Sequence, residues 1–270
     1  MITCDILGYG GSNNGLGNQL FCVATTLSLA LDNSDVAVFP DLKKSHYKFY
    51  SRNIFHKLDC GTNKNFVKNY YKETPYTSTK YSKIPYMENM CLNGHFQSYK
   101  YFSHNEDYIR NLFTLPERLQ DSICSRYSEL LSVDNTVSLH IRRGDYVGDI
   151  FKDRYVNLNE EYYEQALSSI GEYSNIVVFS DDIQWCKNWQ FLKDKAPVFI
   201  ENEFDVVDLF LMSKMSHNII ANSTFSWWSA FLNNNINKKI VAPKEWFGTK
   251  RTNNNLEETK DLIPPDWVRI

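Results

Sequence analysis

The sequence predicts an α/β protein with parallel sheets, and three observations carry this prediction. From about residue 135 onward, short β-branched runs alternate with helical stretches. At the N-terminus, a candidate strand, a glycine-containing loop and a helical stretch follow one another. The chain has 270 residues, of which 43% are hydrophobic, so it can bury a sizeable core. Strands separated by helices of this length imply right-handed crossovers, and such crossovers connect parallel strands.

The C-terminal half shows the alternation most clearly. The expected strands are residues 137–141, 176–179, 198–200, 219–221 and 240–242. The expected helices are residues 160–170, 183–192, 205–215 and 226–232. In the first of these helices, the apolar and aromatic side chains recur at the spacing of one helix face. The C-terminal half is therefore predicted to be a nucleotide-binding α/β unit.

The N-terminal half begins in the same way and then loses its periodicity. Ile2–Leu7 is a candidate strand, the loop 8–17 holds five glycines, and a helix is expected from Leu16 onward. Residues 43–86 are rich in Lys, Asn, Tyr and Ser without a sustained period, which indicates long loops or short helices.

The boundary between the two halves is expected between residues 115 and 135. A proline and a polar stretch there precede the second alternating block. We therefore predict an N-terminal domain of residues 1–125 and a C-terminal domain of residues 126–270.

Charge and composition exclude several classes of partner. The formal net charge is −3 and the basic and acidic residues are intermixed, so neither nucleic acid nor an anionic membrane is expected as a partner. Aromatic residues make up 15% of the chain. That share fits either a dense core or a ring-lined cleft for carbohydrate or nucleobases.

The distribution of apolar residues and cysteines predicts a cytoplasmic protein. The longest helix-like apolar run, Leu20–Leu31, has twelve residues, well short of the ~20 that a membrane span needs. The N-terminal residues lack the pattern of a secretory signal. Six cysteines lie far apart without a C-x-x-C pair, as expected for free thiols in a reducing compartment. We expect at most a peripheral association with the cytoplasmic face of a membrane.

The motif His140-Ile-Arg-Arg-Gly-Asp-Tyr146 follows a predicted buried strand. In open α/β sheets, ligands bind beyond the carboxyl ends of the strands, where Arg142 and Arg143 could fork onto a diphosphate. Gly144 would let backbone or ligand approach closely. The alternative is a structural Arg–Asp pair beside a core histidine.

A second motif, Asn222-Ser-Thr-Phe-Ser-Trp-Trp-Ser229, lies between a predicted strand and a helix. Hydroxyl residues at such a junction cap the helix, and the exposed N–H groups with the helix dipole form a seat for phosphate. The alternative is a helix cap alone, with Trp227 and Trp228 in the core.

Two weaker signals remain. Gly15-x-Gly17 before a helix matches half of a dinucleotide-binding fingerprint, and Asn18 adds an amide there; a tight turn is the alternative. Asp208 lies in an otherwise apolar helix, and a carboxylate can accept both edge hydrogens of guanine. Asp181 and Asp182 end a strand, and carboxylates at such a position, taken in isolation, are more often helix caps.

Taken together, these motifs resemble those of the α-1,2-fucosyltransferase family, glycosyltransferase family 11, and more distantly the α-1,6- and protein O-fucosyltransferases. The segments that follow the family's order are Gly15–Phe21, Phe96–Phe102, His140–Tyr146, Ser180–Asp182, Asn222–Trp228, Trp246–Phe247 and Asp266–Trp267. The resemblance runs nearly end to end. Two departures, His95 before Phe96 and the Cys22-Val23 pair, concern the acceptor side only.

The resemblance implies a GT-B-like fold, with two Rossmann-like domains facing a cleft. It implies an inverting transfer of L-fucose from GDP-β-L-fucose to the 2-hydroxyl of a galactoside, forming an α-1,2-fucoside. The expected partners are GDP-fucose and a glycan that ends in galactose. No metal or other cofactor is implied, and the sequence holds no Asp-x-Asp pair. The alternatives are a related transferase with another nucleotide sugar or linkage, and a sugar-binding protein without turnover.

By the same resemblance, individual residues receive roles. The implied catalytic residues are Arg142, Asp145 and Asn18. The implied donor-binding residues are His140, Arg142, Arg143, Asp181, Asp208, Ser223, Thr224, Phe225, Gly15 and Gly17. The implied acceptor-side residues are Phe96, Gln97 and Tyr99.

The base that takes the acceptor's proton is left open among three carboxylates. Asp145 is the first candidate because it adjoins the arginines, and Asp149 and Asp153 follow in the next loop. The alternative is that Asp145 only pairs with Arg142 or Arg143, since such a pair would lower its pKa and weaken it as a base.

Overall fold

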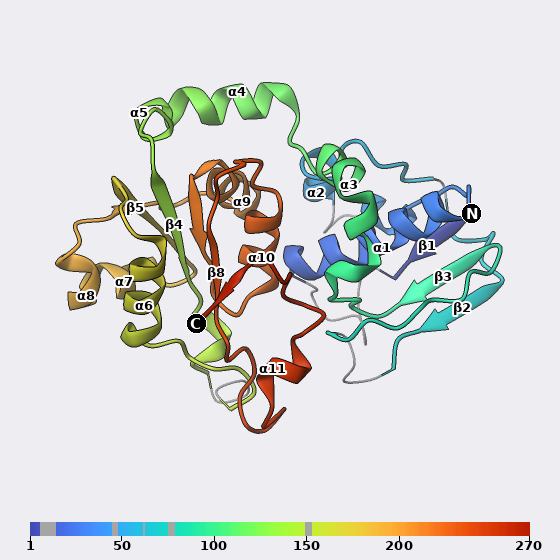
Figure 1. Cartoon of the computed structure of the whole chain (residues 1–270). Coiled ribbons are helices and arrows are strands. Elements are labelled where there is room, and N and C mark those ends of the chain that lie inside the picture. Colours follow the sequence, from blue (N-terminus) through green and yellow to red (C-terminus); the bar gives the residue numbers. More distant parts are fainter. Residues whose placement is uncertain (6–14, 45–47, 62, 75–78, 149–152) are drawn as a thin grey trace. The chain divides into compact units, whose positions relative to one another are not determined.

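The chain divides into two compact units, which are described separately. The structure is a computed structural model, and it describes residues 1–5, 15–44, 48–61, 63–74, 79–148 and 153–270. Unit 1 comprises Met1–Gln120 with Lys260–Pro264, and unit 2 comprises Asp121–Thr259 with Pro265–Ile270 (Figure 1).

Unit 1 is built on a small parallel sheet. Its strand order is β1 (Ile2–Cys4), β3 (Met90–Asn93) and β2 (Asn69–Lys72), all parallel. An isolated parallel bridge from Ile2 to Ala37 extends the sheet on the other side of β1. The helices are α1 (Leu16–Asp32), η2 (Pro40–Lys43), α2 (Lys48–Arg52), η4 (Tyr99–Tyr101), η5 (Ser103–Asn105) and α3 (Glu106–Leu112). Most of α1 is buried because its apolar side chains pack against the sheet.

Unit 2 is built on a larger parallel sheet. Its strand order is β6 (Val198–Phe199), β5 (Asn175–Ser180), β4 (Thr136–Ile141), β7 (His217–Ile219), β8 (Ile240–Ala242) and β9 (Val268–Arg269). Numbered along the chain, this is the order 3-2-1-4-5-6 of a dinucleotide-binding fold. The predicted α/β class with two Rossmann-like units is therefore confirmed.

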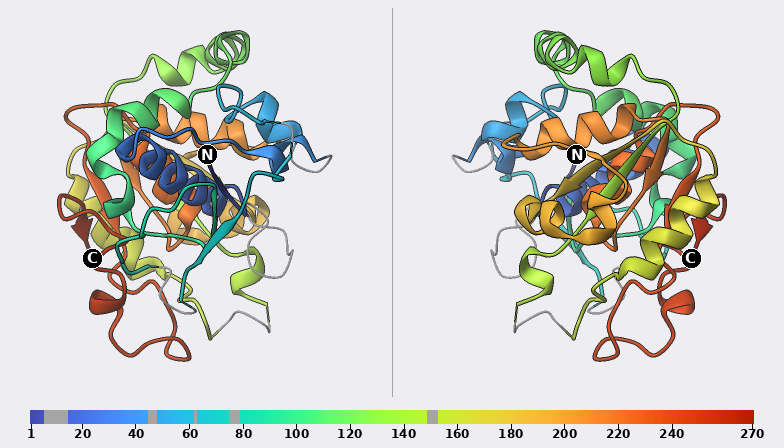
Figure 2. Two further views of the ribbon diagram at one scale, coloured as in Figure 1. Left: turned by 90° about the vertical axis from the view of Figure 1, so that its right-hand side faces the viewer. Right: turned by 90° about the vertical axis from the view of Figure 1, so that its left-hand side faces the viewer.

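Helices cover both faces of the unit 2 sheet (Figures 1 and 2). They are α6 (Glu160–Ile170), α7 (Ile183–Asn188), α8 (Gln190–Lys193), α9 (Asp205–Lys214) and α10 (Thr224–Phe231). One face of β4 presents Val137, Leu139 and Ile141 to a core with α6, α7 and α8. Smaller helical segments are α4 (Glu117–Arg126), α5 (Ser128–Leu131), η6 (Gly144–Tyr146) and α11 (Asn255–Glu258).

Several elements differ from the sequence-based expectation. The helix expected at 183–192 is interrupted at Trp189, which has extended backbone angles. The strand expected at 219–221 covers His217–Ile219 instead, because the polar Asn218 is satisfied inside the core. The strands β2, β3 and β9 were not predicted, since each is short and lacks a clear period.

The division between the units also has a feature that the local pattern did not predict. It falls inside α4, a few residues before the predicted boundary, and residues 260–264 return to unit 1. Asp261 fixes this return: its carbonyl oxygen accepts hydrogen bonds from the Ser98 hydroxyl at 2.7 Å and the Tyr99 N–H at 3.2 Å. Its carboxylate pairs with Lys100 at 2.5 Å.

No helix in the described part of the chain combines the length and the apolar character that crossing a membrane requires. All six cysteines are free thiols. Cys4, Cys22, Cys91 and Cys186 are buried.

An asparagine anchors the other face of β4. Asn218 is fully buried, and its amide nitrogen donates to the Ser138 hydroxyl at 2.7 Å and to the Met212 carbonyl oxygen at 2.8 Å. Its amide oxygen accepts a hydrogen bond from Asn233 at 2.7 Å. These bonds join β4, β7 and α9, because each group would otherwise lie unpaired in the core.

We expect Asn218→Ala to lower the free energy of unfolding by about 2 to 4 kcal/mol, because several buried polar groups lose their partner at once. Urea denaturation followed by tryptophan fluorescence measures this change. Asn237→Ala is the matched control, because Asn237 is exposed, and it should change stability by less than about 0.5 kcal/mol. A loss below about 1 kcal/mol for Asn218→Ala would contradict the anchoring role.

Candidate active site

The chain reverses its direction of travel across the unit 2 sheet between β4 and β7. From β4 the chain moves outward through β5 and β6, then returns to place β7 on the other side of β4. In an open parallel sheet, ligands bind beyond the strand ends at this switch point. The segments that follow β4 and β7 contain the two motifs that the sequence singled out.

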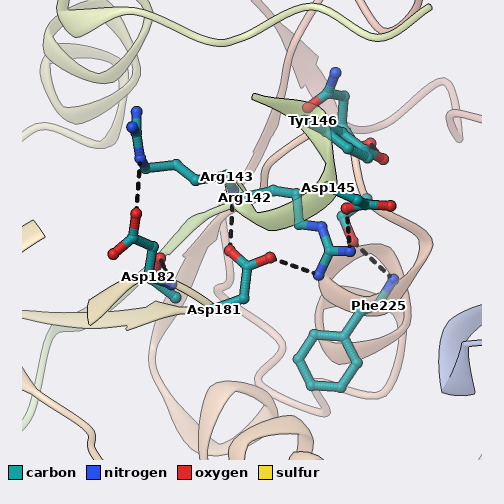
Figure 3. Close-up of polar contacts among 10 residues, drawn as sticks. Arg142, Arg143, Asp145, Tyr146, Asp181, Asp182 and Phe225 are labelled. Carbon is teal, nitrogen blue, oxygen red and sulfur yellow. Dashed lines mark hydrogen bonds and ion pairs between the residues drawn. The ribbon is translucent and has the colours of Figure 1, made fainter. Parts of the chain in front are cut away.

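Successive residues after β4 point to opposite faces of the sheet. His140 and Arg142 share the face of Ser138, whereas Arg143 shares the face of Ile141, because side chains alternate along an extended chain. Figure 3 shows the two guanidinium groups pointing in different directions. The expectation that both arginines fork onto one diphosphate therefore does not match this placement.

Arg142 lies between two carboxylates. Its guanidinium contacts Asp181 at 2.9 Å and Asp145 at 2.5 Å, and lies 5.4 Å from the ring centroid of Tyr146. Partial burial acts to lower the pKa of Arg142, but the nearby carboxylates, Asp181 first, outweigh it and raise the pKa. The group is a fixed, permanently charged cation that is still 31% exposed.

Arg143 is directed at α7 instead. Its guanidinium lies 3.6 Å from the ring centroid of Trp185, and its Nε is 3.3 Å from Asp182. Asp182 also caps α7 by accepting the Trp185 N–H. Arg143 and Asp182 thus hold the end of β4 against α7, and the cap alternative for Asp182 is the arrangement that the structure shows.

Asp181 links the ends of β4 and β5. Its two carboxylate oxygens accept from the Arg143 backbone N–H at 2.9 Å and from the Arg142 guanidinium at 2.9 Å (Figure 3). The carboxylate lies directly against Gly144: a Cβ atom there would be 2.3 Å from Oδ2 of Asp181. Glycine is therefore required at position 144 because the Asp181 carboxylate packs against its backbone, and not only because a ligand could approach there.

Tyr146 joins the two motifs. Its hydroxyl donates to the backbone carbonyl oxygen of Asn222 at 3.0 Å, and its ring stacks on Tyr155 with centroids 4.3 Å apart. The Asn222 amide donates to the carbonyl oxygens of Val156 at 2.9 Å and Trp246 at 2.8 Å. Asn222 is thus a structural residue, and the sequence did not assign Tyr146 this role because the contact spans 76 residues.

The second motif begins α10. Ser223 is its N-cap: the hydroxyl oxygen accepts the Phe225 N–H at 3.3 Å. Trp227 and Trp228 are fully buried, as the cap-only alternative expects. Thr224 and Phe225 are half-buried at the first turn, where the positive end of the helix dipole lies. Figure 3 shows Phe225 on the same side of the strand end as Arg142.

His140 is held neutral. It is 4% exposed, and burial together with the charge of Arg142 lowers its pKa to about 3. Its ring centroid lies 5.8 Å from that of Phe225. Its Nδ1 has no hydrogen-bond partner among the described residues. A neutral imidazole with an open ring nitrogen can bind a polar ligand group but cannot supply charge to a phosphate.

Asp208 lies in the first turn of α9, at the same edge of the sheet as the first turn of α10. Its Oδ1 is buried and accepts no hydrogen bond within the described residues. Burial raises its pKa to about 7, and the charges of Glu203 and Asp205 add to that effect. A buried carboxylate without a donor is costly, which is typical of a group kept for a ligand.

The candidate residues of unit 1 form a separate group. The Asn18 amide oxygen accepts a hydrogen bond from the Gln97 amide at 2.8 Å. Gly15 is the N-cap of α1, and a Cβ there would meet no described residue within 4 Å; Gly17 is buried in the helix. Tyr99 is half-buried and its N–H donates to Asp261. Asn18 and Gln97 are thus brought together across 79 residues of sequence.

Phe96 does not reach the surface of unit 1. It is 0% exposed and packs between Tyr71 and Tyr101, so its expected role as a direct acceptor contact is corrected to a core role. Its backbone has a φ of 48°, which is strained for a non-glycine residue. A strained backbone angle persists only where surrounding contacts hold it, so the loop around Phe96 must be held in one conformation by its neighbours.

Glu73 holds that loop, and no pattern in the sequence around Glu73 predicted this role. Its carboxylate accepts the N–H groups of His95 at 2.8 Å and Phe96 at 3.1 Å. Burial raises the pKa of Glu73, although the two N–H donors act against it. The thiol of Cys22 donates to the Gly94 carbonyl oxygen at 3.1 Å. The two departures from the family pattern, Cys22 and His95, therefore both contribute to this loop.

The remaining acidic candidates are less informative. Asp149 lies outside the described residues. Asp153 forms an ion pair with Lys250. Within the described part of the chain, no three His, Cys, Asp or Glu side chains are grouped so as to hold a metal ion, and the expected metal independence stays a prediction.

Comparison with known sequences identifies similar proteins. The model of glycosyl transferase family 11 matches residues 16–270. The O-antigen biosynthesis glycosyltransferase WbnK of Escherichia coli is 35% identical over 75% of this chain and 68% of its own length. An alpha-1,2-colitosyltransferase of Escherichia coli is 37% identical over 66% of this chain and 61% of its own. The mouse galactoside 2-alpha-L-fucosyltransferase Sec1 is 28% identical over 80% of this chain and 62% of its own. The matched region is thus about two thirds of each relative.

Solved structures show the same fold. The fucosyltransferase NodZ from Bradyrhizobium superimposes with a TM-score of 0.57 and 11% identity, covering 84% of this chain and 91% of NodZ. NodZ is described as an alpha-1,6-fucosyltransferase, and one of its crystals was soaked with GDP-fucose. At this identity the similarity establishes the fold alone, a GT-B arrangement of two parallel-sheet units.

The raised pKa of Asp208 gives stability a definite dependence on pH. The folded chain binds this proton more tightly than the unfolded chain, whose carboxyl has the ordinary value of 3.8. The contribution of Asp208 to the free energy of unfolding is therefore most favourable below about pH 4. It becomes less favourable as the pH rises, and it is lost once the pH has passed about 7. We expect Asp208→Asn to be more stable than the wild type at pH 8, by about 1 to 3 kcal/mol, and equally stable near pH 4.

Urea denaturation between pH 4 and pH 8 measures the difference between the two proteins. Asp121→Asn, at an exposed position on α4, is the control and should show no such growth with pH. A difference that is constant across this range would contradict the raised pKa of Asp208.

Proposed function

The chain belongs to glycosyltransferase family 11, and we propose that it transfers L-fucose from GDP-β-L-fucose to the 2-hydroxyl of a β-galactoside, with inversion to an α-1,2-fucoside. The geometry of Arg142 is the observation that carries the proposal. A permanently charged guanidinium, held by two carboxylates, lies at the switch point of a nucleotide-binding sheet.

In the proposed reaction, the oxygen of the acceptor hydroxyl bonds to the anomeric carbon of fucose and displaces GDP, and the hydroxyl proton passes to an oxygen of the departing diphosphate. The bond from that carbon to the phosphate oxygen breaks, so negative charge grows on the diphosphate. Arg142 would neutralise this charge by donating hydrogen bonds to phosphate oxygens. The N–H groups of the first turn of α10, beside Thr224 and Phe225, would bind the same diphosphate.

Asp145 and Asp181 act as positioning residues in this proposal. Both accept hydrogen bonds from Arg142, and together they fix the direction of its guanidinium. This geometry favours the pairing alternative for Asp145 over a role as the base. Arg143 and Asp182 stabilise the strand end from the other face.

The nucleoside would be recognised between α9 and α10. We propose that the Asp208 carboxylate accepts the two edge hydrogens of guanine, which would fill the missing hydrogen bonds of its buried oxygen. His140 and Phe225 would contact the nucleoside or phosphates at the same end of the sheet. Binding of guanine would require the charged form of Asp208, so affinity should fall as pH drops below about 7.

On unit 1, we propose that the Asn18–Gln97 amide pair contacts the acceptor sugar. Both side chains are half-buried, and their amide groups are of the kind that both donate hydrogen bonds to sugar hydroxyls and accept them. Asn18 would orient the hydroxyl that reacts, and Glu73 would fix Gln97 through the strained loop at Phe96. We expect the protein to act in the cytoplasm or at the cytoplasmic face of a membrane, without a metal ion.

A second donor deserves a direct comparison, because a 37% identical relative is an alpha-1,2-colitosyltransferase. Colitose is fucose without the 3-hydroxyl, so both GDP-sugars present the same diphosphate and guanine to unit 2. Residues that bind GDP therefore do not distinguish the two donors.

We expect GDP release and an α-1,2-linked product when the purified protein receives GDP-fucose and a β-galactoside. The measurement is donor turnover with GDP-fucose and GDP-colitose in parallel, followed by linkage analysis of the product. If turnover is at least tenfold faster with GDP-colitose than with GDP-fucose, GDP-fucose is not the preferred donor and this part of the proposal is wrong. A product linked at another hydroxyl would overturn the regiochemistry, and no transfer to any galactoside would overturn the proposed acceptor.

Gly144 offers a sharp test of the Arg142 geometry. We expect Gly144→Ala to lower kcat at least tenfold, because the new Cβ must displace the Asp181 carboxylate that orients Arg142. Stability should change by less than about 1 kcal/mol, since a partly exposed carboxylate can move aside. Arg142→Ala removes the guanidinium altogether and should give the lowest kcat of the series. We expect it to lose about 2 to 4 kcal/mol of transition-state stabilisation.

Gly148→Ala is the matched control. Among the described residues, a Cβ at Gly148 would meet the Asp145 carbonyl oxygen alone, at 3.4 Å, which is an ordinary contact, so turnover should stay within about twofold of wild type. Equal turnover of the Gly144→Ala and Gly148→Ala proteins would contradict the positioning role of Asp181.

A further inference from the structure

Unit 1 contains a pocket that the proposed reaction does not use. Its volume is about 730 Å³, within the range of ligand sites. Its lining combines one face of α1, the segment 81–86, and residues around η4 and η5. The lining residues that carry the argument are Thr25, Asp32, Tyr81, Tyr86, Lys100 and His104. We call it the tyrosine pocket.

The chemistry of the tyrosine pocket fits a neutral, polyhydroxylated ligand. Tyr81 is 44% exposed and Tyr86 is 37% exposed, so ring surface is available for the apolar face of a sugar. Two of the ionic pairs compensate each other's charge: Lys100 pairs with Asp261, and His104 lies 2.9 Å from Asp32, whereas Lys83 is an exposed cation of the lining. A pocket built to bind an anion would carry excess positive charge.

A buried hydroxyl adds an independent sign of a ligand. Thr25 lines the tyrosine pocket and is 1% exposed, and its Oγ1 has no hydrogen-bond partner among the described residues. Buried hydroxyls are normally hydrogen-bonded, so a polar partner from outside the protein would complete this one.

Two elements lead from the Asn18–Gln97 pair to the tyrosine pocket. Thr25 follows Asn18 by seven residues on α1, which places both on one helix face about 10 Å apart. Gln97 is followed closely by Lys100 and Tyr101, which line the pocket. The pair and the pocket therefore lie about 10 Å apart along α1, a distance that a short glycan can span, and the segment 97–101 joins them, although Phe21 and Cys22 between them are buried.

We propose that the tyrosine pocket is a second carbohydrate subsite, which binds the internal sugars of the acceptor glycan while its terminal sugar lies at the Asn18–Gln97 pair. The inference rests on the proposed glycan acceptor. The pocket then selects acceptors by length and internal sequence. The Asn18–Gln97 pair selects only the sugar that receives fucose.

Two ligands test the proposal: methyl β-galactoside and a neutral tetrasaccharide that ends in β-galactose. Without donor, saturation-transfer NMR should show contact between the internal sugars of the tetrasaccharide and the wild-type protein, and Tyr86→Ala should remove most of that signal. With donor, Tyr86→Ala and Tyr81→Ala should lower the ratio of kcat/KM for the tetrasaccharide to that for methyl β-galactoside about tenfold.

Tyr70→Ala is the matched control, because Tyr70 is a 70% exposed tyrosine of unit 1 that does not line the pocket. In Tyr70→Ala, the ratio of kcat/KM for the tetrasaccharide to that for methyl β-galactoside should stay within twofold of the wild-type value. An unchanged ratio and an unchanged NMR signal in Tyr86→Ala would overturn the subsite, even if transfer proceeds as proposed. Tetrasaccharide binding that depends on Tyr86 would support the subsite, even if no fucose is transferred.

Discussion

The carboxylate of Asp181 is the contact on which the rest of the candidate site depends. One of its oxygens accepts the backbone N–H of Arg143 and the other accepts the guanidinium of Arg142. It therefore fixes both the path of the chain after β4 and the direction of the catalytic candidate. The carboxylate fits only because residue 144 has no side chain. A charge-assisted pair of this kind is well ordered when each lone pair has a partner, and here both oxygens have one.

A second constraint ties this strand end to the rest of unit 2. The Tyr146 hydroxyl bonds to the backbone at Asn222, and Asn222 in turn bonds to two further loops through its amide. The loop after β4 and the start of α10 are thus held in one arrangement before any ligand binds. Preorganised donors need little movement when charge develops on a leaving group, which is the condition for effective electrostatic stabilisation. Unit 1 follows the same logic, with Glu73 holding a strained loop so that Gln97 meets Asn18.

The site also contains groups that lower stability. Asp208 carries a buried oxygen without a partner, and His140 carries a buried ring nitrogen without one, in the described residues. Each costs free energy in the unliganded protein, and each lies at the edge where open parallel sheets in general bind their ligands. Thr25 in unit 1 is a third case, next to a pocket of a size and polarity that suit sugars. Stability is reduced at the places where the proposed ligands would supply the missing hydrogen bonds.

Local patterns in the sequence are sufficient to predict the fold class and the location of the candidate site. Alternating periods of two and 3.6 residues identify the parallel unit 2 sheet, and the motifs at His140–Tyr146 and Asn222–Ser229 follow from strand ends. The contacts of the individual side chains depend on the folded arrangement of each unit and could not be predicted from these patterns. Adjacent residues of an extended chain point to opposite faces, so Arg142 and Arg143 separate, and Phe96 turns out to lie in the core. Tyr146, Glu73 and Asp261 act through partners that are 22 to 163 residues away in sequence. Local sequence patterns do not predict such contacts, because the packing of the whole unit determines which residues that are distant in sequence come together.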